Sequence, residues 1–458
     1  MLFNSHEFIL FFMPVVFCGY FWLGSTRYSD LANIWIAFAS LFFYGCWNIR
    51  FLPLLLASIT VNYLFSLGIL HARECGQIQK KKWLFIGSIC FNLGLLCYYK
   101  YLAFFLSLLG IHVEQQPIPL GISFFTFTQL LYLLDCHSGT VKKHKVSDYA
   151  LFVSFFPHLM AGPILYHKTM MVQFDNKELR RINWDNLSRG FCLFIIGLGK
   201  KILIADAFIP CVAWGFDNVG ALSQQAAWLL TICFLMQLYF DFSGYSDMAV
   251  GLARMMNIDI PINFNAPLRA TSIANFWQRW HISLTKALTA CVFTPIVRAF
   301  KSVTFGHAVF AAFVTFFLCG LWHGASMTFV VLSLVQGIAV VINMAWRHKK
   351  LPMPKWLGHT LTLLTILVFM VFFRANNVHD ALHVLSTMYS FQFTDAPLAM
   401  LPKYTLFISL LLVTFSPTSN EIVERIKPNV WMAAAFALVF CLSFANLTKV
   451  STFLYFQF

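Results

Sequence analysis

The sequence predicts an all-α, polytopic integral membrane protein, and three observations carry that prediction. Of the 458 residues, 59% are hydrophobic and only 11% are charged. The mean hydropathy of +0.72 is too high for a soluble chain of this length, which needs more charge to cover its surface. Apolar stretches recur from end to end, so lipid must be the main solvent of the chain.

The apolar stretches define candidate membrane spans. We expect spans at 7–24, 30–46, 52–71, 83–105, 118–136, 147–164, 187–208, 225–255, 306–321, 324–346, 356–374, 402–416 and 429–446. Residues 381–392 are a candidate re-entrant or interfacial segment, and 168–186 is a polar loop with a short surface helix. The sequence therefore predicts about 11–13 membrane-embedded helices. Because no polar stretch is long enough to fold alone, residues 1–458 are expected to form a single membrane domain.

Loop charges predict the orientation. On one side of the first five spans the loops contain Arg27, Arg73, Lys80, Lys81, Lys82, Lys142, Lys143 and Lys145, and on the other side only Arg50 and Lys100. Basic loops face the cytoplasm, so the N-terminus is expected outside it. The net charge of +14 then reflects loops that contact membrane lipid rather than nucleic acid, and no nucleic-acid partner is expected.

A segment rich in tryptophan, 275–284, has the pattern of an amphipathic helix. Trp277, Trp280, His281, Leu284 and Leu288 fall at helical spacing and would share one face. Such a helix lies in a membrane interface or lines a wet cavity. His281 is then either a core histidine bonded to a backbone carbonyl or a functional group beside two indoles.

His323 interrupts an apolar run that extends from Gly306 to Trp346. This run is about twice the roughly 20 residues of one crossing, so it must break, and its glycines indicate a break at 320–326. The first limb, about 307–320, is short for a crossing, which places His323 below the membrane surface within the protein. An ionisable group at such depth is a functional candidate, because a neutral imidazole can accept a proton from a hydroxyl and return it. The alternative is a structural histidine at a helix break.

Asp241 and Asp247 lie in a strongly apolar neighbourhood. Buried carboxylates need partners, which we expect to be Arg279 or a cluster of backbone N–H groups. The two carboxylates either pin helices together or act by orienting an imidazole or binding sugar hydroxyls. Nucleotide-binding, zinc-protease and hydrolase motifs are absent from the sequence, so neither a metal nor a bound cofactor is expected.

Several segments together carry a resemblance to a known family. They are 119–127 (PLGISFFTF), 155–163 (FFPHLMAGP), 199–206 (GKKILIAD), 239–247 (YFDFSGYSD), 263–267 (NFNAP), 276–284 (FWQRWHISL), 321–325 (LWHGA) and 453–458 (FLYFQF). In order and spacing, over nearly the whole chain, they resemble the alginate O-acetyltransferase branch of the membrane-bound O-acyltransferase (MBOAT) family.

The resemblance implies that His323 is the catalytic histidine and His281 a second important one. It implies a ring of helices around a thin neck, with funnels on both faces. The candidates to line the neck or contact substrate are Trp277, Gln278, Arg279, Trp280, Ser283, Trp322, Asp241 and Asp247. Oxyanion stabilisation is expected from His281, Ser283 or nearby amides.

The resemblance also implies an enzyme of the bacterial cytoplasmic (inner) membrane. It would take an acyl group from acetyl-CoA or a carrier-bound thioester and pass it outward, often to an extracytoplasmic partner acyltransferase. The expected reaction is O-acetylation of a cell-envelope polysaccharide of the alginate type. Peptidoglycan O-acetylation and teichoic-acid D-alanylation are alternatives, and a transporter without acyl chemistry is an alternative of another class.

One departure from the family pattern follows Lys286. Where the family usually has an Arg-Asp pair, this chain has Thr289 and Ala290, followed by Cys291. The departure removes an ion pair near His281. It leaves open a different substrate surface, compensation by another residue, reduced activity, or a scaffold without chemistry.

Overall fold

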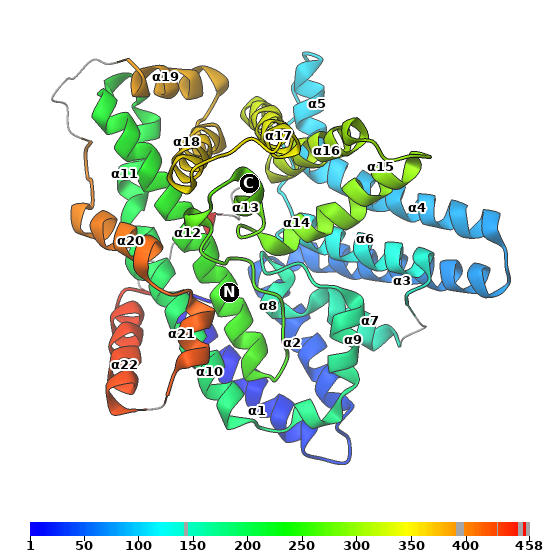
Figure 1. Cartoon of the computed structure of the whole chain (residues 1–458). Coiled ribbons are helices and arrows are strands. Elements are labelled where there is room, and N and C mark those ends of the chain that lie inside the picture. The colour runs from blue at the N-terminus through cyan, green and yellow to red at the C-terminus, as the bar shows by residue number, and fades with distance from the viewer. Residues whose placement is uncertain (142–144, 391–397, 428, 448–451, 455–458) are drawn as a thin grey trace. The chain divides into compact units, whose positions relative to one another are not determined.

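The computed structural model describes residues 1–141, 145–390, 398–427, 429–447 and 452–454, and this part of the chain contains helices and loops without a β-strand (Figure 1). The predicted all-α class is therefore confirmed. The chain divides into two compact units. Unit 1 contains Met1–Ile196, Tyr245–Ile262 and Pro428–Thr452, and unit 2 contains Gly197–Gly244, Asn263–Lys427 and Phe453–Phe458. The expectation of a single membrane domain stays a prediction.

Unit 1 holds the N-terminal helices. They are η1 (Phe8–Phe12), α1 (Met13–Gly24), α2 (Leu31–Trp47), η2 (Ile49–Phe51), α3 (Leu52–Glu74), α4 (Ile78–Leu96), η3 (Cys97–Tyr101), α5 (Leu102–Leu108), α6 (Ile122–Ser138), α7 (Val146–Ser154), α8 (Phe156–Leu159), α9 (His167–Asp175), η4 (Lys177–Arg180), most of α10 (Trp184–Gly199), and α22 (Val430–Ala445). Within this unit α1 packs on α2, and α3, α4 and α6 pack on one another.

Unit 2 holds the helices around the predicted site. They are η5 (Lys200–Ala205), η6 (Asp206–Phe208), α11 (Ile209–Asp217), η7 (Val219–Ala221), η8 (Pro267–Arg269), α13 (Ile273–Trp277), α14 (Ile282–Leu288), η9 (Thr289–Phe293), α15 (Thr294–Ala299), α16 (Phe305–His323), α17 (Met327–His348), α18 (Lys355–Arg374), α19 (Val378–Met388), α20 (Lys403–Phe415) and α21 (Ser419–Arg425). The long α12 (Gln224–Met255) contributes residues to both units.

The length and composition of these helices confirm a multi-pass membrane protein. Among the described residues, seven helices are long and apolar enough to cross a membrane, and the pair α20 and α21, bent by 66°, would add an eighth. Three shorter apolar helices are Phe8–Gly24, Leu31–Trp47 and Val430–Ala445. The ring of helices around a neck stays a prediction.

The predicted spans need correction at two places. Residues 147–164 form no single span, because Phe155, whose backbone is not helical, separates α7 from α8, and both short helices are largely buried in protein. Conversely, Ile282–Ala299 is a helix of spanning length where no span was expected. Pro295 is tolerated there because it directly follows the π-helix η9, and such a local change of helix type accommodates the missing N–H of a proline.

Lys100 also needs correction, since it was counted as a loop cation. Its side chain is only 5% exposed, and it lies in η3 within the candidate span Ile78–Leu108. Removing it from the count strengthens the asymmetry of the loop charges, and the orientation stays a prediction. Lys142 and Lys143 lie outside the described residues.

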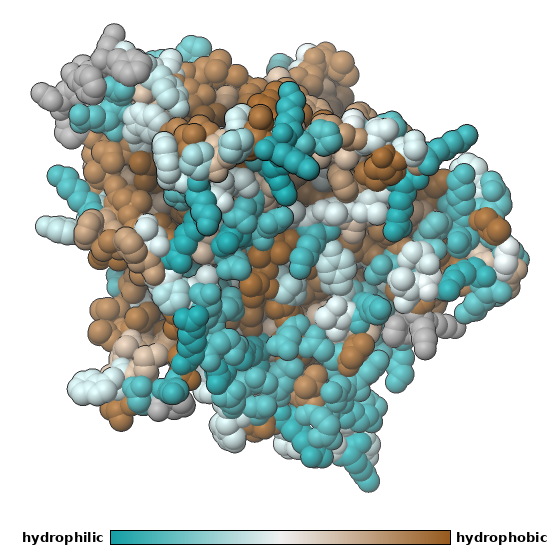
Figure 2. All heavy atoms as spheres, viewed as in Figure 1, coloured by the Kyte–Doolittle hydropathy of each residue, from teal (hydrophilic) through white to brown (hydrophobic). Residues whose placement is uncertain are grey.

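The surface over α20 is suited to lipid. Tyr404, Phe407 and Phe415 are 86%, 63% and 76% exposed, and apolar atoms gather at the surface over this helix (Figure 2). In water a continuous apolar surface of this kind would be an association site, whereas in a bilayer it is simply solvated by acyl chains.

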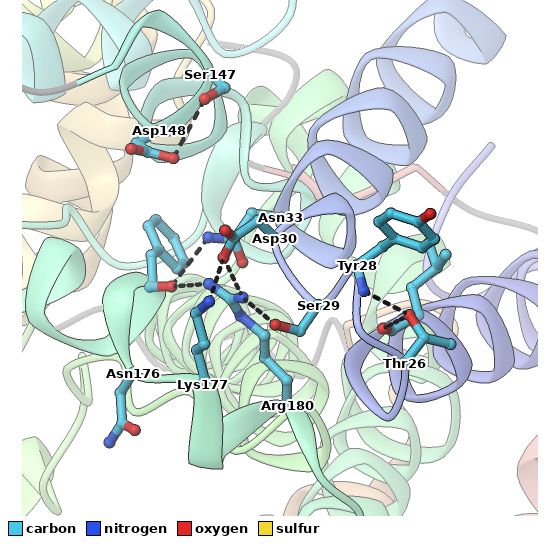
Figure 3. A network of polar contacts seen from close by, with 12 residues as sticks. Thr26, Tyr28, Ser29, Asp30, Asn33, Ser147, Asp148, Asn176, Lys177 and Arg180 are labelled. Atoms are coloured by element: carbon cyan, nitrogen blue, oxygen red, sulfur yellow. Dashed lines mark hydrogen bonds and ion pairs between the residues drawn. The ribbon is translucent and has the colours of Figure 1, made fainter.

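The predicted polar loop 168–186 does contain short helices, α9 and η4, which a buried arginine links to the α1–α2 connection within unit 1 (Figure 3). Arg180 donates to Asp30 at 2.9 Å and to the carbonyl of Phe174 at 2.7 Å, and the same carbonyl accepts from Asn33 at 2.9 Å. The guanidinium also lowers the pKa of the exposed Asp30 carboxyl by hydrogen bonding to it. This contact anchors the loop to the connection between α1 and α2.

A reciprocal pair of amides joins α3 and α4. Asn62 donates to Asn92 at 3.2 Å and accepts from it at 2.5 Å, and each amide also donates to a carbonyl one turn earlier in its own helix. Both side chains are fully buried. Amide pairs of this kind link membrane helices because lipid offers them no alternative partner.

We predict that Asn92→Leu lowers the free energy of unfolding by about 1–2 kcal/mol, because it leaves the buried Asn62 amide partly unsatisfied. The measurement is SDS-induced unfolding of the purified protein. The double variant Asn62→Leu/Asn92→Leu should lie closer to wild type than the single variant. A double variant that loses the sum of both single effects would show that the pair is not coupled.

Candidate active site

His323 is the last residue of α16, and the predicted break follows it. Gly324 is extended, and α17 starts at Met327 after the cap residue Ser326. The break is therefore where the glycines indicated. The first limb, however, is longer than predicted, because α16 has 19 residues and is a candidate span by itself. His323 thus lies at the end of a span rather than beyond a short limb, and it is only 7% exposed.

Close packing between α16 and α17 positions the residues after the break. A Cβ atom on Gly320 would lie 2.7 Å from the Cα of Ser333, which no real side chain tolerates, so only glycine permits this approach. His323 follows Gly320 by three residues, and Gln336 follows Ser333 by three residues. Because α16 and α17 run antiparallel, with Gly337 against Phe313 as Gly320 is against Ser333, His323 lies about one turn to one side of this contact and Gln336 about one turn to the other. Both side chains nevertheless line the cavity described below.

The segment 275–284 is not the continuous helix that its spacing predicted. Helix α13 ends at Trp277, α14 begins at Ile282, and His281 between them has a left-handed backbone with φ 45°. The residues expected on one face are nevertheless all buried, namely Trp277, Trp280, His281, Leu284 and Leu288. Tertiary packing, rather than helical periodicity, buries them together.

Asn263 holds the break in place. Its carbonyl accepts from the backbone N–H of Ile282 at 3.0 Å, and its side-chain oxygen accepts from the N–H and hydroxyl of Ser283 at 3.2 and 2.6 Å. These bonds satisfy groups at the start of α14 and compensate for the unfavourable backbone of His281. Non-glycine residues in this conformation are often found at functional sites, which makes His281 a stronger candidate than its sequence spacing did.

The two predicted histidines come together in unit 2. The ring of Trp322 lies 6.0 Å from that of His281 and 5.1 Å from that of His323, measured between centroids. Both imidazoles therefore lie against the same indole ring. Phe242 packs edge-on against His281 at 4.8 Å, and Phe373 against His323 at 5.3 Å. The surroundings of both rings are thus aromatic and apolar.

A cavity of about 20 Å³ adjoins His323 in unit 2. It is lined by Leu238, Phe276, Trp277, Trp280, His323, Gln336, Ile366, Phe369, Met370 and Phe373. The volume accommodates a water- or methyl-sized group. The cavity is therefore too small for a whole acyl donor, and larger substrates require these side chains to move.

Asp241 has a different partner from the one predicted. Lys201 bonds to Asp241 at 2.7 Å and to Asp206 at 2.8 Å, and the backbone N–H of Leu454 donates to the other oxygen of Asp241 at 3.0 Å. Arg279 instead donates to the carbonyl of Asn265 at 3.2 Å. The prediction of Arg279 is wrong because Lys201 of η5 supplies the cation instead, whereas one of the expected backbone N–H donors is present.

The remaining predicted residues lie in varied places. Ser283 is buried against Asn263, Gln278 is exposed, and Asp247 is buried farther along α12 in unit 1. At the departure from the family pattern, Thr289 is exposed and donates to the carbonyl of Thr285 at 2.7 Å. Thr289 thus lies about two helical turns after His281 on a surface of α14–η9.

Sequence reasoning missed Gln336, Lys201 and the structural use of Asn263. Gln336 and Lys201 each had a usable signal, because each is a polar residue in a strongly apolar stretch. Among the described residues, no group of three or more His, Cys, Asp or Glu side chains is arranged to hold a metal ion.

We predict that Lys201→Met lowers the free energy of unfolding by about 3–5 kcal/mol, because it leaves the buried Asp241 charge uncompensated. The measurement is again SDS-induced unfolding. The double variant Lys201→Met/Asp241→Asn should recover a large part of the loss. If the double variant were no more stable than Lys201→Met, the ion pair would not be what holds this part of unit 2 together.

Comparison with known proteins assigns the chain to a family. Residues 84–378 match the family described as MBOAT, membrane-bound O-acyltransferase. The chain belongs to this family. The peptidoglycan O-acetyltransferase of Helicobacter pylori is 39% identical over 85% of this chain and 80% of its own length. The probable alginate O-acetylase AlgI of Pseudomonas aeruginosa is 35% identical over 91% of this chain and 81% of its own length.

A more distant relative is the teichoic acid D-alanyltransferase of Streptococcus thermophilus, 27% identical over 55% of this chain and 68% of its own length. Membership of the family makes this membrane protein an acyltransferase that uses an acyl donor. The prediction of an acyltransferase is therefore confirmed over the alternative of a transporter without acyl chemistry.

Proposed function

We propose that this membrane enzyme transfers an acetyl group from a thioester donor to hydroxyl groups of a cell-envelope polysaccharide, with His323 at the reacting centre. The observation that carries the proposal is the meeting of His281 and His323 in one buried, aromatic environment, with His323 against a cavity. The names of the relatives support acyl transfer to polysaccharide.

His323 acts as the general base in this mechanism. Its imidazole removes the proton of the acceptor hydroxyl while the oxygen attacks the thioester carbonyl. The carbon–sulfur bond then breaks, an ester forms, and the imidazolium returns the proton to the leaving thiolate. His281 contacts the same indole, Trp322, as His323 does. We assign it the role of orienting the reacting groups or stabilising the oxyanion.

The lining of the cavity favours acetyl over D-alanyl as the transferred group. A D-alanyl group carries an ammonium, which needs an anionic partner when it leaves water, because one neutral acceptor such as the Gln336 amide oxygen does not compensate its charge. The described residues that line the cavity include no acidic side chain. An acetyl methyl group, in contrast, is suited to the surfaces of Leu238, Ile366, Phe369 and Met370.

The proposal also includes the acyl donor, the membrane and the partner protein. The donor is acetyl-CoA or a carrier-bound acyl thioester that reaches the site from the cytoplasm. The enzyme lies in the bacterial cytoplasmic membrane with its N-terminus outside, as the loop charges indicate. An extracytoplasmic partner acyltransferase completes the transfer where the polymer cannot reach the site.

We expect His323→Ala to abolish acetyl transfer and His281→Ala to reduce it by at least about 100-fold, because each removes a group at the reacting centre. The measurement is transfer of radiolabelled acetyl from acetyl-CoA into base-labile ester in membrane vesicles. His379→Ala, at a solvent-exposed histidine, is the matched control and should keep full activity. A His323→Ala variant that folds and retains wild-type transfer would exclude the proposed chemistry.

The acceptor is expected to be alginate-like, and the 39% identity to a peptidoglycan enzyme makes peptidoglycan a second candidate. The test compares cells with and without the gene. Acetate released by mild base is measured separately from purified peptidoglycan and from extracellular polysaccharide. A gene-dependent change in only one polymer identifies the acceptor, and no change in either polymer would contradict a polysaccharide acceptor.

A further inference from the structure

The cavity beside His323 contains an amide that sequence reasoning did not single out. Gln336 is 4% exposed, lies on α17 and lines the cavity together with His323. Its neighbours there are mainly aromatic and aliphatic, including Phe369, Met370 and Phe373. An amide in such surroundings loses its hydration on folding and needs another partner to compensate for it.

Among the described residues, the amide oxygen of Gln336 has no hydrogen-bond partner, and neither does the indole N–H of Trp277, which lines the same cavity. A buried polar atom without a partner costs about 1–3 kcal/mol. Such atoms persist where a ligand, an ion or a bound water completes them. Helix α13, which carries Trp277, packs against α17, so the two unpaired groups approach the cavity from neighbouring helices.

On the basis of the proposed acetyl transfer, we propose that Gln336 determines acyl specificity by binding the carbonyl of the acetyl group beside His323. A glutamine amide presents N–H donors or a carbonyl acceptor according to its rotation about the last side-chain bond. The unpaired oxygen of this amide and the acyl oxygen are both acceptors, so the amide must rotate until its N–H donors face the cavity and donate to the acyl oxygen. These donors bind that oxygen more strongly as negative charge develops on it during attack.

The size of the cavity sets the length of the acyl group. A volume of about 20 Å³ takes one methyl-sized group, so the acetyl methyl fits while its carbonyl lies toward Gln336 and His323. A longer chain would meet Phe369 and Met370. The same residues therefore orient the carbonyl and limit the chain to two carbons.

The test replaces Gln336 with an apolar side chain of similar volume. Gln336→Met should lower kcat for acetyl transfer about 100-fold, as loss of an oxyanion donor does, with little change in the KM for acetyl-CoA. Thermal stability should stay the same or rise, because the substitution removes an unsatisfied buried amide. A residue with a purely structural role would instead lose stability and activity together.

Gln237→Met is the matched control. Gln237 is also a buried glutamine of unit 2, 6% exposed, and its amide oxygen has no partner within the described part of the chain, but it does not line the cavity. This variant should keep wild-type kcat. If Gln336→Met keeps the wild-type kcat while His323→Ala is inactive, the role of Gln336 is overturned and the proposed function stands. The unpaired amide would then be completed by a bound water that plays no part in catalysis. If Gln336→Met and His323→Ala both keep the wild-type kcat, the role of Gln336 and the proposed function are both overturned.

A second variant tests the proposed limit on the length of the acyl chain. Met370→Ala should raise the ratio of propionyl to acetyl transfer at least tenfold, measured with propionyl-CoA and acetyl-CoA in the same membrane vesicles. An unchanged ratio would overturn the assignment of this cavity as the place where the acyl chain ends.

Discussion

A charge buried in the interior of a membrane protein must find its partner within the chain, and this constraint organises unit 2. Lys201 binds two carboxylates at once, from η6 and α12, and Asp241 also accepts from the backbone of Leu454. Three stretches that are distant in sequence are thereby joined at one point. Because lipid supplies no hydrogen bonds, each of these contacts is harder to replace than it would be at a surface exposed to water.

Two local irregularities place the histidines. The left-handed backbone of His281 separates α13 from α14. The side chain of Asn263 accepts hydrogen bonds from the N–H and hydroxyl of Ser283 at the start of α14. On the other side, Gly320 lets α16 approach α17 so closely that the end of α16 is held against its neighbour. Unfavourable backbone and close contact are each tolerated because surrounding bonds compensate for them.

The small size of the cavity beside His323 limits which groups reach the reacting centre. Aromatic rings pack against both imidazoles, and the adjoining cavity has room for one water- or methyl-sized group, so bulk water and larger groups enter only when side chains move. Exclusion of water strengthens the electrostatic interactions available to the reacting groups and limits hydrolysis of the donor. The departure at Thr289 lies on an exposed surface of α14–η9 and leaves the cavity lining unchanged, so we place its effect on substrate or partner contacts rather than on the acyl group.

The sequence by itself determined the all-α membrane class, the break after His323 and the family, because hydropathy, glycine positions and ordered motifs are local properties of the chain. It also named both histidines, although their roles remain proposals. Only the tertiary structure decided that Lys201 is the partner of Asp241, that 275–284 is broken at His281, and that Gln336 adjoins His323. Each of these depends on contacts between residues distant in sequence, and periodicity within a single segment carries no information about such contacts.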